Sequence, residues 1–160
     1  MKNEILRLLR KNGRLSFEDI AVQLNVEPEF VRSAVTEMEE SGVISGYQAV
    51  VDESLLPETK VKAIIEVNIR PQRDGGFDKI ALRIARFAEV NSMYLISGGY
   101  DLELEVQGDS LQAIASFVSG KLATIDGVTS TATRFILKKY KEAGRIFDHE
   151  EEYKRLQVAP

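Results

Sequence analysis

Residues 28–41, PEFVRSAVTEMEES, place polar side chains at a helical spacing that suits contact with nucleic acid. Arg32, Ser33 and Thr36 project from the face opposite the apolar residues of this segment. A guanidinium pairs with guanine edges, and the hydroxyls of serine and threonine bond to several bases. The pattern therefore favours recognition of a surface over the cleavage of a bond.

The residues that usually build an active site are missing. The sequence has no cysteine, which excludes thiol catalysis and thiolate metal sites, and its one histidine is His149, near the C-terminus. It also lacks a Ser/His/Asp set and a phosphate-binding loop of the GxxxxGKS type. The acidic run at 148–152 is interpreted as solvated, as charge runs usually are. We therefore expect no catalytic residue, no metal site and no cofactor.

Three short helices are predicted in residues 1–45, which we call the head. Ser16 and Asp19 have the spacing of a near capping box, so residues 17–24 are predicted to be helical. Pro28 suits a first helical turn and Gly42 a helix end, which predicts a second helix over 28–41. The apolar stripes are Ile5, Leu8 and Leu9; Phe17, Ile20, Ala21 and Leu24; and Phe30, Val31, Ala34, Val35 and Met38. A helix-turn-helix has this plan, and an ordinary three-helix bundle has the same stripes.

Charge sets a condition on nucleic-acid binding by the head. The whole chain has a net charge of −4, and residues 1–48 hold six cations against eight anions, a net charge of −2. Neutralisation of phosphates supplies most of the non-specific affinity for DNA. One head alone should therefore bind poorly, and useful affinity needs two or more heads held together.

Length and composition bound the rest of the architecture. With 160 residues and 44% hydrophobic content, the chain is long enough for two small domains with real cores. No apolar run approaches the roughly 20 residues that span a bilayer, and the N-terminus has amphipathic spacing rather than a signal peptide. We expect a cytoplasmic protein with no membrane partner.

The pattern changes after Ile44. Residues 46–53 (GYQAVVDE) are predicted as a short connecting strand and residues 55–60 as a linker. From Val61 the order is strand, helix, strand, strand, helix, strand. The predicted strands are 61–69, 93–97, 102–106 and 128–140; the first helix follows Asp74-Gly75-Gly76, and the second has Leu111, Ile114, Ala115, Val118 and Leu122 facing inward.

This order is that of a ferredoxin-like domain, with both helices on one face of a four-stranded antiparallel sheet. The predicted fold class is therefore α+β, a helix-turn-helix head followed by a ferredoxin-like domain. Ile64 and Ile136 point away from the helix-facing residues of their strands and would lie in water in a monomer. We expect a second copy of the chain to cover this face.

The segments LSFEDIA, EMEESGVI, SGGYDLELEV and GVTSTATRFILKKYK together resemble the Lrp/AsnC (feast/famine) transcription regulators, over about residues 3–141. The resemblance implies a winged-helix-like DNA-binding domain (1–45), a connecting strand and linker (46–60), a RAM dimerisation and effector domain (61–142) and a charged tail (143–160). It also implies a homodimer that assembles into a tetramer or an octamer. In the family, the connecting strand pairs with its partner's copy, and an amino acid binds between dimers near a glycine hairpin. The implied function is sequence-specific, amino-acid-responsive binding of double-stranded DNA.

Carried over to this sequence, the resemblance places residues 28–41 in the major groove. The candidates for base contact are Arg32, Ser33 and Thr36. The candidates for phosphate contact, at the start of the preceding helix, are Arg14 and Ser16. Relatives usually carry more arginine and lysine along this helix. This chain departs from them with the carboxylates of Glu27, Glu29, Glu37 and Glu40.

The hairpin sequence GGYD is the second candidate site. Gly98 and Gly99 are expected to supply positive φ angles, Tyr100 to pack, and Asp101 to cap the turn. The resemblance adds an effector site, in which exposed N–H groups hold a ligand carboxylate and the Asp101 carboxylate accepts its ammonium group. The remaining residues assigned to this cleft are Thr131 and Thr133.

Two alternative functions stay open. A metabolite-sensing oligomer with weak or lost DNA binding would explain the acidic recognition helix, and a gel shift separates it from a repressor. A relative of the haem-pathway decarboxylases, which share the architecture, would need histidines and arginines in a pocket. The single histidine lies instead in the tail.

Overall fold

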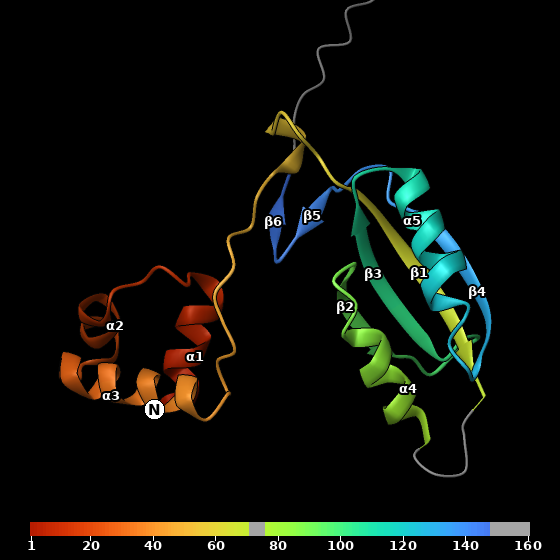
Figure 1. The fold of residues 1–160 in the computed structure, drawn as a ribbon. Helices are drawn as coiled ribbons and strands as arrows, with labels where there is room; N and C mark the ends of the chain where they lie inside the picture. Colours follow the sequence, from red (N-terminus) through yellow and green to blue (C-terminus); the bar gives the residue numbers. More distant parts are fainter. Residues whose placement is uncertain (71–75, 148–160) are drawn as a thin grey trace, which may run out of the picture. The chain divides into compact units, whose positions relative to one another are not determined.

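The computed structural model describes residues 1–70 and 76–147, and the chain divides into two units between Val51 and Asp52 (Figure 1). The first unit is helical, and the second, which we call the sheet domain, is built on a β-sheet. The predicted acidic run at 148–152 and the predicted turn residues Asp74 and Gly75 lie outside the described residues. Among the described helices, none has the length and hydropathy needed to cross a membrane.

Three helices share the core of the first unit: α1 (Lys2–Lys11), α2 (Phe17–Leu24) and α3 (Pro28–Glu40). Its fully buried residues are Ile5, Ile20, Ala21, Val31, Ala34, Val35 and Met38. They come from the three predicted stripes. Phe30 is an exception at 47% exposed, because a helix turns by about 100° per residue and Phe30 lies beside the buried stripe rather than in it.

Local sequence determines where α2 and α3 begin and end. Ser16 Oγ accepts the N–H of Asp19 at 3.0 Å, and the Asp19 carboxylate accepts the N–H of Ser16 at 3.4 Å, which completes the capping box. Asn25 ends α2 in the left-handed conformation (φ 52°), and Gly42 follows α3 with a φ of 75°. Only residues 25–27 separate the two helices, which is the short turn of a helix-turn-helix.

A four-stranded antiparallel sheet forms the centre of the sheet domain. Its strands are β1 (Val61–Ile69), β2 (Val90–Leu95), β3 (Leu102–Gly108) and β4 (Val128–Phe135), in the spatial order β2-β3-β1-β4. The helices α4 (Gly76–Ala85) and α5 (Leu111–Phe117) cover one face of it (Figure 1). The predicted ferredoxin-like α+β fold is therefore confirmed.

The core of the sheet domain lies between the sheet and these helices. Along β1, Ala63, Ile65 and Val67 are fully buried and alternate with residues that face the other way. Their partners in the core include Leu102, Leu104 and Val106 of β3, Ile80 and Ile84 of α4, and Ile114 and Phe117 of α5. Ile64 lies on the opposite face, as predicted, and Ile136 is 37% exposed.

The segment after Phe117 differs from the predicted regular helix. It continues as a π-helical turn, η2 (Val118–Leu122), and Phe117 is 3% exposed. Leu111 is 55% exposed, and Ala115 is also exposed, so their prediction as inward-facing residues was wrong. α5 directs Ile114 and Phe117 inward, so Ala115, one residue after Ile114, is turned about 100° away from it, and Leu111 is the first residue of the helix, at its exposed end.

The last predicted strand is shorter than expected. β4 ends at Phe135 rather than at Tyr140. Ile136 still donates its N–H to the Lys62 carbonyl, but β1 begins at Val61, so it offers no further partner to the chain after Ile136. Two further short strands, β5 (Lys141–Glu142) and β6 (Arg145–Ile146), pair as a separate hairpin. Part of the segment interpreted as a charged tail therefore belongs to the sheet domain.

The connecting strand predicted at 46–53 does not form in the described chain, since no strand of the two sheets pairs with residues 46–52. The Tyr47 hydroxyl donates to Glu39 Oε1 at 2.9 Å, which fastens the start of this segment to α3. At its other end a short 3₁₀ turn, η1 (Glu53–Leu55), is capped by Asp52. The prediction was wrong for a single chain, because the backbone N–H and C=O groups of a strand need a neighbouring strand as their hydrogen-bond partner.

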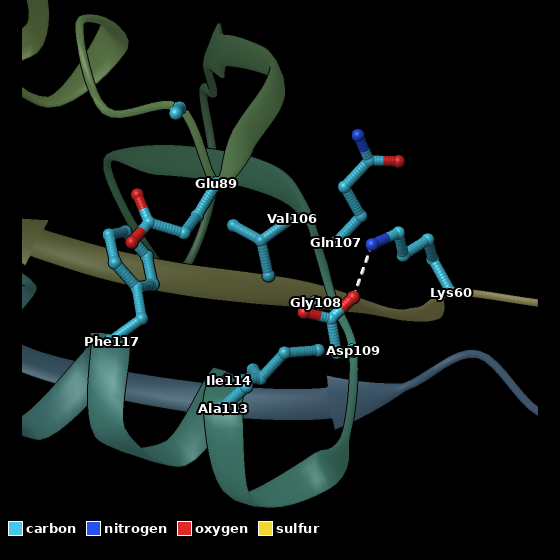
Figure 2. Close-up of a pocket in the computed structure, with 10 residues that line it drawn as sticks. Lys60, Glu89, Val106, Gln107, Gly108, Asp109, Ala113, Ile114 and Phe117 are labelled. Carbon is cyan, nitrogen blue, oxygen red and sulfur yellow. Dashed lines mark hydrogen bonds and ion pairs between the residues drawn. The ribbon is translucent and has the colours of Figure 1, made fainter.

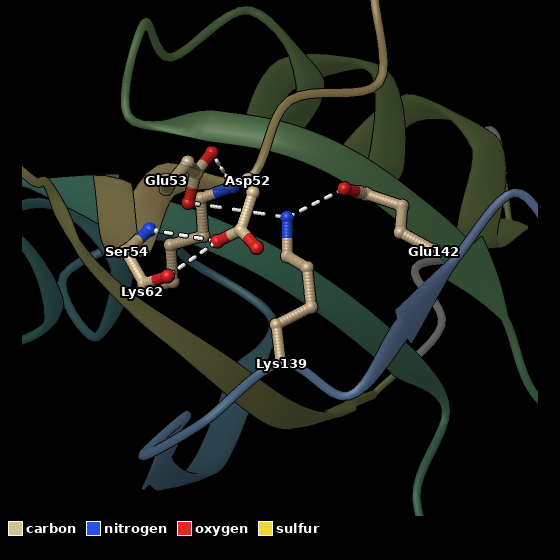
Figure 3. Close-up of polar contacts among 6 residues, drawn as sticks. All are labelled: Asp52, Glu53, Ser54, Lys62, Lys139 and Glu142. Carbon is tan, nitrogen blue, oxygen red and sulfur yellow. Dashed lines mark hydrogen bonds and ion pairs between the residues drawn. The ribbon is translucent and has the colours of Figure 1, made fainter. Parts of the chain in front are cut away.

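Charged side chains anchor η1 to the sheet domain (Figure 3). Lys62 Nζ lies 2.7 Å from Glu53 Oε1, and the Lys62 side chain is only 14% exposed. Lys139 Nζ lies 2.5 Å from Glu142 Oε2 and 3.9 Å from Glu53 Oε2. Partial burial lowers the pKa of Lys139, but the hydrogen bond to Glu142 and the two carboxylate charges outweigh it and raise the pKa overall. The group links η1, β1 and the β5–β6 hairpin.

Candidate functional site

The candidate base contacts lie together on one exposed face of α3. Arg32, Ser33 and Thr36 are all exposed, whereas Val31 and Val35 of the same helix are buried in the core. Residues three and four apart on a helix share a face. The structure therefore places these three side chains on the surface of the helix-turn-helix. Their contact with bases stays a prediction.

The guanidinium of Arg32 already has partners in the head. Its Nε lies 3.4 Å from Glu29 Oε2, and its Nη2 lies 3.9 Å from Glu18 Oε1 on α2. Its central carbon lies 4.9 Å from the centroid of the Phe17 ring, a cation–π arrangement. Exposed ion pairs of this kind contribute about 0–1 kcal/mol. A guanine edge is therefore able to replace the carboxylates.

The candidate phosphate contacts lie at the start of α2. Ser16 Oγ is used as the acceptor of the capping box, and its hydroxyl hydrogen is left to donate. The first turn of α2 also carries the carboxylates of Glu18 and Asp19, which compensate the positive end of the helix dipole. Attraction of a phosphate here would therefore come from the exposed Arg14 rather than from the helix end.

Other basic residues of the head were missed by the sequence reasoning. Lys2 Nζ lies 2.5 Å from Glu37 Oε1, so an α3 carboxylate neutralises the charge of Lys2. Four exposed cations, by contrast, make no ion pair with any residue that the structure describes: Arg7, Arg10, Lys11 and Arg14. Three of these cations lie on α1. Composition counts their charges, but only the fold shows which cations have no ion-pair partner among the described residues.

Asp101 closes one end of the sheet. Its Oδ2 accepts the N–H of Ile69 at 2.7 Å, and its own N–H donates to the Val67 carbonyl at 3.1 Å. Its carbonyl accepts the N–H of Ile96 at 2.8 Å. The carboxylate thus has a structural role in joining β1 to the hairpin, and only its second oxygen is left for a ligand.

The two glycines of the hairpin do not have positive φ angles, and that prediction was wrong. The loop between β2 and β3 spans residues 96–101, and a loop of this length turns without the left-handed residues that a two-residue hairpin needs. A Cβ on Gly98 would lie 3.6 Å from Ile96, and a Cβ on Gly99 would have nothing within 4 Å. Both glycines are exposed, so their backbone is accessible to a ligand or to another chain.

Tyr100 joins a polar group on the sheet face opposite the helices. Its hydroxyl donates to Glu103 Oε2 at 2.5 Å, and this bond, with partial burial and the charges of Glu103 and Glu66, raises the pKa of Tyr100. Arg134 binds both oxygens of Glu66, at 3.0 and 2.9 Å. Glu66 is paired with Glu103 across β1 and β3, on the face that also carries Ile64. This face therefore mixes charged and apolar side chains.

The two threonines do not lie beside the hairpin in the sheet. Thr131 and Thr133 are paired with Val67 and Ile65, on the helix-facing side of β4, and both are half-buried. β1 separates β4 from β3, the strand that follows the hairpin. Packing accounts for β-branched residues at these positions, and their assignment to an effector cleft stays a prediction.

The helix-turn-helix and the sheet domain define a two-part regulator that binds DNA through its N-terminal helices. Residues 2–45 match the family model for winged helix-turn-helix DNA-binding domains. Residues 62–146 match the model for the Lrp/AsnC ligand binding domain. The chain belongs to the Lrp/AsnC family of helix-turn-helix transcriptional regulators.

Its relatives share both parts. The chain is 42% identical to the uncharacterized HTH-type transcriptional regulator YugG of Bacillus subtilis, over 99% of this chain and 96% of that protein. It is 28% identical to the regulatory protein AsnC of Haemophilus influenzae, over 83% and 87%. The solved structure of AsnC from E. coli matches with a TM-score of 0.65 and 26% identity, over 88% of this chain and 93% of that one. A transcriptional regulator of Neisseria meningitidis, solved in complex with L-Met, matches with a TM-score of 0.69 and 25% identity, over 88% and 90%.

Asp101 provides a test of the hairpin that needs no ligand. Asp101→Ala leaves the Ile69 N–H without its acceptor, so we expect the free energy of unfolding to fall by about 1–3 kcal/mol. Asp101→Asn keeps an amide oxygen as acceptor and should lose less. Urea denaturation followed by circular dichroism measures both variants. An alanine variant as stable as the unaltered protein would show that the carboxylate has no structural role.

Proposed function

We propose that this regulator reads its operator with the exposed face of α3, where Arg32, Ser33 and Thr36 contact base edges. The observation that carries the proposal is the division of α3 into a buried face and an exposed polar face directly after a three-residue turn. Residues 1–45 serve as the DNA-binding domain, and residues 61–142, extended to Ile146 by the β5–β6 hairpin, serve as the RAM domain. We infer a regulatory role in the cytoplasm, without catalysis, because the relatives are regulators.

Phosphate contacts come from Arg14 and Ser16 together with the last turn of α1. Arg10 and Lys11 lie in that last turn, a short distance along the chain from Arg14. Since these cations have no carboxylate partner among the described residues, their charge is available for phosphates. Arg32 and Lys2 each pair with a carboxylate of the head, which supports the alternative that this head binds DNA weakly. A gel shift with the gene's own promoter tests this alternative.

Assembly brings several heads to one DNA molecule. The sheet face opposite the helices carries the half-buried Ile64 and the exposed Tyr94 beside the paired charges of Glu66 and Arg134, and a second copy of the chain would cover it. Residues 46–52, which pair with no strand of the described sheets, would find a ladder in the partner's copy of the same segment. Further association into a tetramer or an octamer is part of the proposal. Two linked heads gain the affinity that a head of net negative charge lacks.

An amino acid acts as effector at the hairpin, bound by the exposed backbone of Gly98 and Gly99 and by Asp101. Support comes from the match to a ligand binding domain over residues 62–146 and from the Neisseria regulator solved with L-Met. The glycines fit this role because no side chain or backbone of this chain requires them to lack a Cβ. An incoming carboxylate or a second chain is then the reason for their small size.

The first prediction separates base contacts from phosphate contacts. Arg32→Ala should lower the ratio of specific to non-specific DNA affinity, because a bidentate guanine contact gives about 1–3 kcal/mol of discrimination. Arg14→Ala should weaken binding to all sequences and reduce the salt slope by about one unit. Fluorescence anisotropy titrations across salt concentrations measure both.

Glu29→Gln is the control, since it removes the nearer of the two carboxylates beside Arg32 and takes a negative charge from α3. It should raise affinity without reducing specificity. An unchanged specificity ratio for Arg32→Ala would show that the assigned recognition face is wrong.

The second prediction concerns the dimer. Light scattering at micromolar concentration should show no monomer near 17.9 kDa. Ile64→Lys should shift the population toward monomer, because an unpaired charge would enter the interface. Leu82→Lys, on a position of α4 that is 61% exposed, should leave the assembly intact. A monomer peak in the unaltered protein contradicts dimerisation.

The third prediction concerns the effector. At about a hundred times its dissociation constant, an amino acid should stabilise the native state by roughly 2.7 kcal/mol, which a thermal-shift screen of the twenty amino acids detects. Gly99→Val should abolish the shift in melting temperature. A Cβ at this position would contact no other atom of the chain, so the added side chain would obstruct only a bound ligand. If no amino acid moves the melting temperature, the hairpin is structural only.

A further inference from the structure

Phe30 is an exposed aromatic side chain near the start of α3, the second helix of the helix-turn-helix. It is 47% exposed, the largest exposed fraction among the seven phenylalanines, all of which lie in the described residues. Phe17, the other phenylalanine of the head, packs against the core instead. An aromatic ring stabilises a structure mainly when it leaves water, so the ring of Phe30 is available to stabilise a complex.

The helix places this ring at the end of α3 where base contacts are expected. Phe30 is the third residue of α3, which begins at Pro28, and the first residues of such a helix are those that reach base edges. Its backbone N–H donates to the Glu27 carbonyl at 3.0 Å, so Phe30 already belongs to the ordered first turn. Helical side chains lean toward the N-terminus of their helix, so the ring covers this leading end. Ser33 follows on the same side of α3 and is also exposed.

The groups around Phe30 disfavour a phosphate as the partner of its ring. Glu29, the preceding residue, is 80% exposed, and Glu37, seven residues further along α3, is 65% exposed. These carboxylates repel phosphates, and a phenyl ring has no hydrogen-bond donor to offer one. In the major groove, thymine presents its C5 methyl group, and phenylalanine is among the side chains that contact it. The other three bases present only polar groups there, so thymine is the base that suits Phe30.

We propose that Phe30 is a specificity-determining residue, which recognises a thymine of the operator through its C5 methyl group. The inference rests on the proposed function, because it requires α3 to lie in the major groove. It adds an apolar contact to the polar contacts assigned to Arg32, Ser33 and Thr36. An apolar contact releases no counterions, so it gives this acidic head a sequence preference that does not weaken as salt rises.

Replacement of thymine by deoxyuridine tests the contact, because it removes the methyl group and keeps the base pair. The probe is a duplex that the full-length protein enriches from a random-sequence library, and each thymine position of the enriched site is replaced in turn. At one position, we expect binding to weaken about fourfold, the loss of one buried methyl group. The factor should be the same at about 50 and 200 mM salt. No loss at any thymine, or a loss that disappears at the higher salt, would overturn the proposal.

Variants of Phe30 assign the methyl contact to this side chain. Phe30→Ala shortens the side chain, and Phe30→Gln keeps much of its length but ends in a polar group. Both should bind the thymine and deoxyuridine duplexes equally. Val43→Ala is the control, because Val43 is 61% exposed and lies beyond the other end of α3, and it should keep the fourfold preference. Circular dichroism checks that each variant is folded, and a fourfold preference kept by either folded Phe30 variant would show that another residue contacts the methyl group.

The same titrations separate this inference from the proposed function. If the protein enriches no site from the library, the reading of an operator by α3 is wrong, and the role of Phe30 is wrong with it. An enriched site whose recognition is lost in Arg32→Ala but is insensitive to every thymine methyl group would overturn the role of Phe30 alone.

Discussion

Burial of one face of β1 is the interaction on which the rest of the sheet domain depends. This strand pairs on both sides, and its helix-facing residues are fully removed from water beneath α4 and α5. The polar features lie near its two ends. Lys60 borders a pocket beside Val106 and Ile114 (Figure 2), and Lys62 anchors η1 at the start of the strand. At the other end, the Asp101 carboxylate accepts the N–H of Ile69. A change in the register of β1 would move all of them at once.

Electrostatics imposes the second constraint, on the head. Carboxylates on α2 and α3 engage Arg32, and Glu37 engages Lys2, so these two helices neutralise some of the head's own cations. The basic residues at the end of α1 make no ion pair with the described residues, and in the proposed function they attract phosphates. In the proposed function such a head gains by being linked to others, so the proposal ties DNA binding to assembly of the sheet domain.

Elements with strong local signals were predictable. The capping box of Ser16 and Asp19, the turn at 25–27 and the alternation along β1 all rest on neighbours within a few residues, and the structure has each of them. The order of strands and helices was predicted for the same reason. The segment 46–53 was not, since a strand there needs a partner that a single chain does not supply.

Sequence by itself determined the periodic faces of the helices and strands, because alternation of apolar and polar residues decides which side leaves water. Only the tertiary structure decided contacts between elements. Glu18 meets Arg32 across two helices, and the Asp101 carboxylate meets the N–H of Ile69 across two strands. It also decided that Gly98 and Gly99 turn without positive φ. These features depend on distances between segments far apart in the chain, and packing of the whole domain sets those distances.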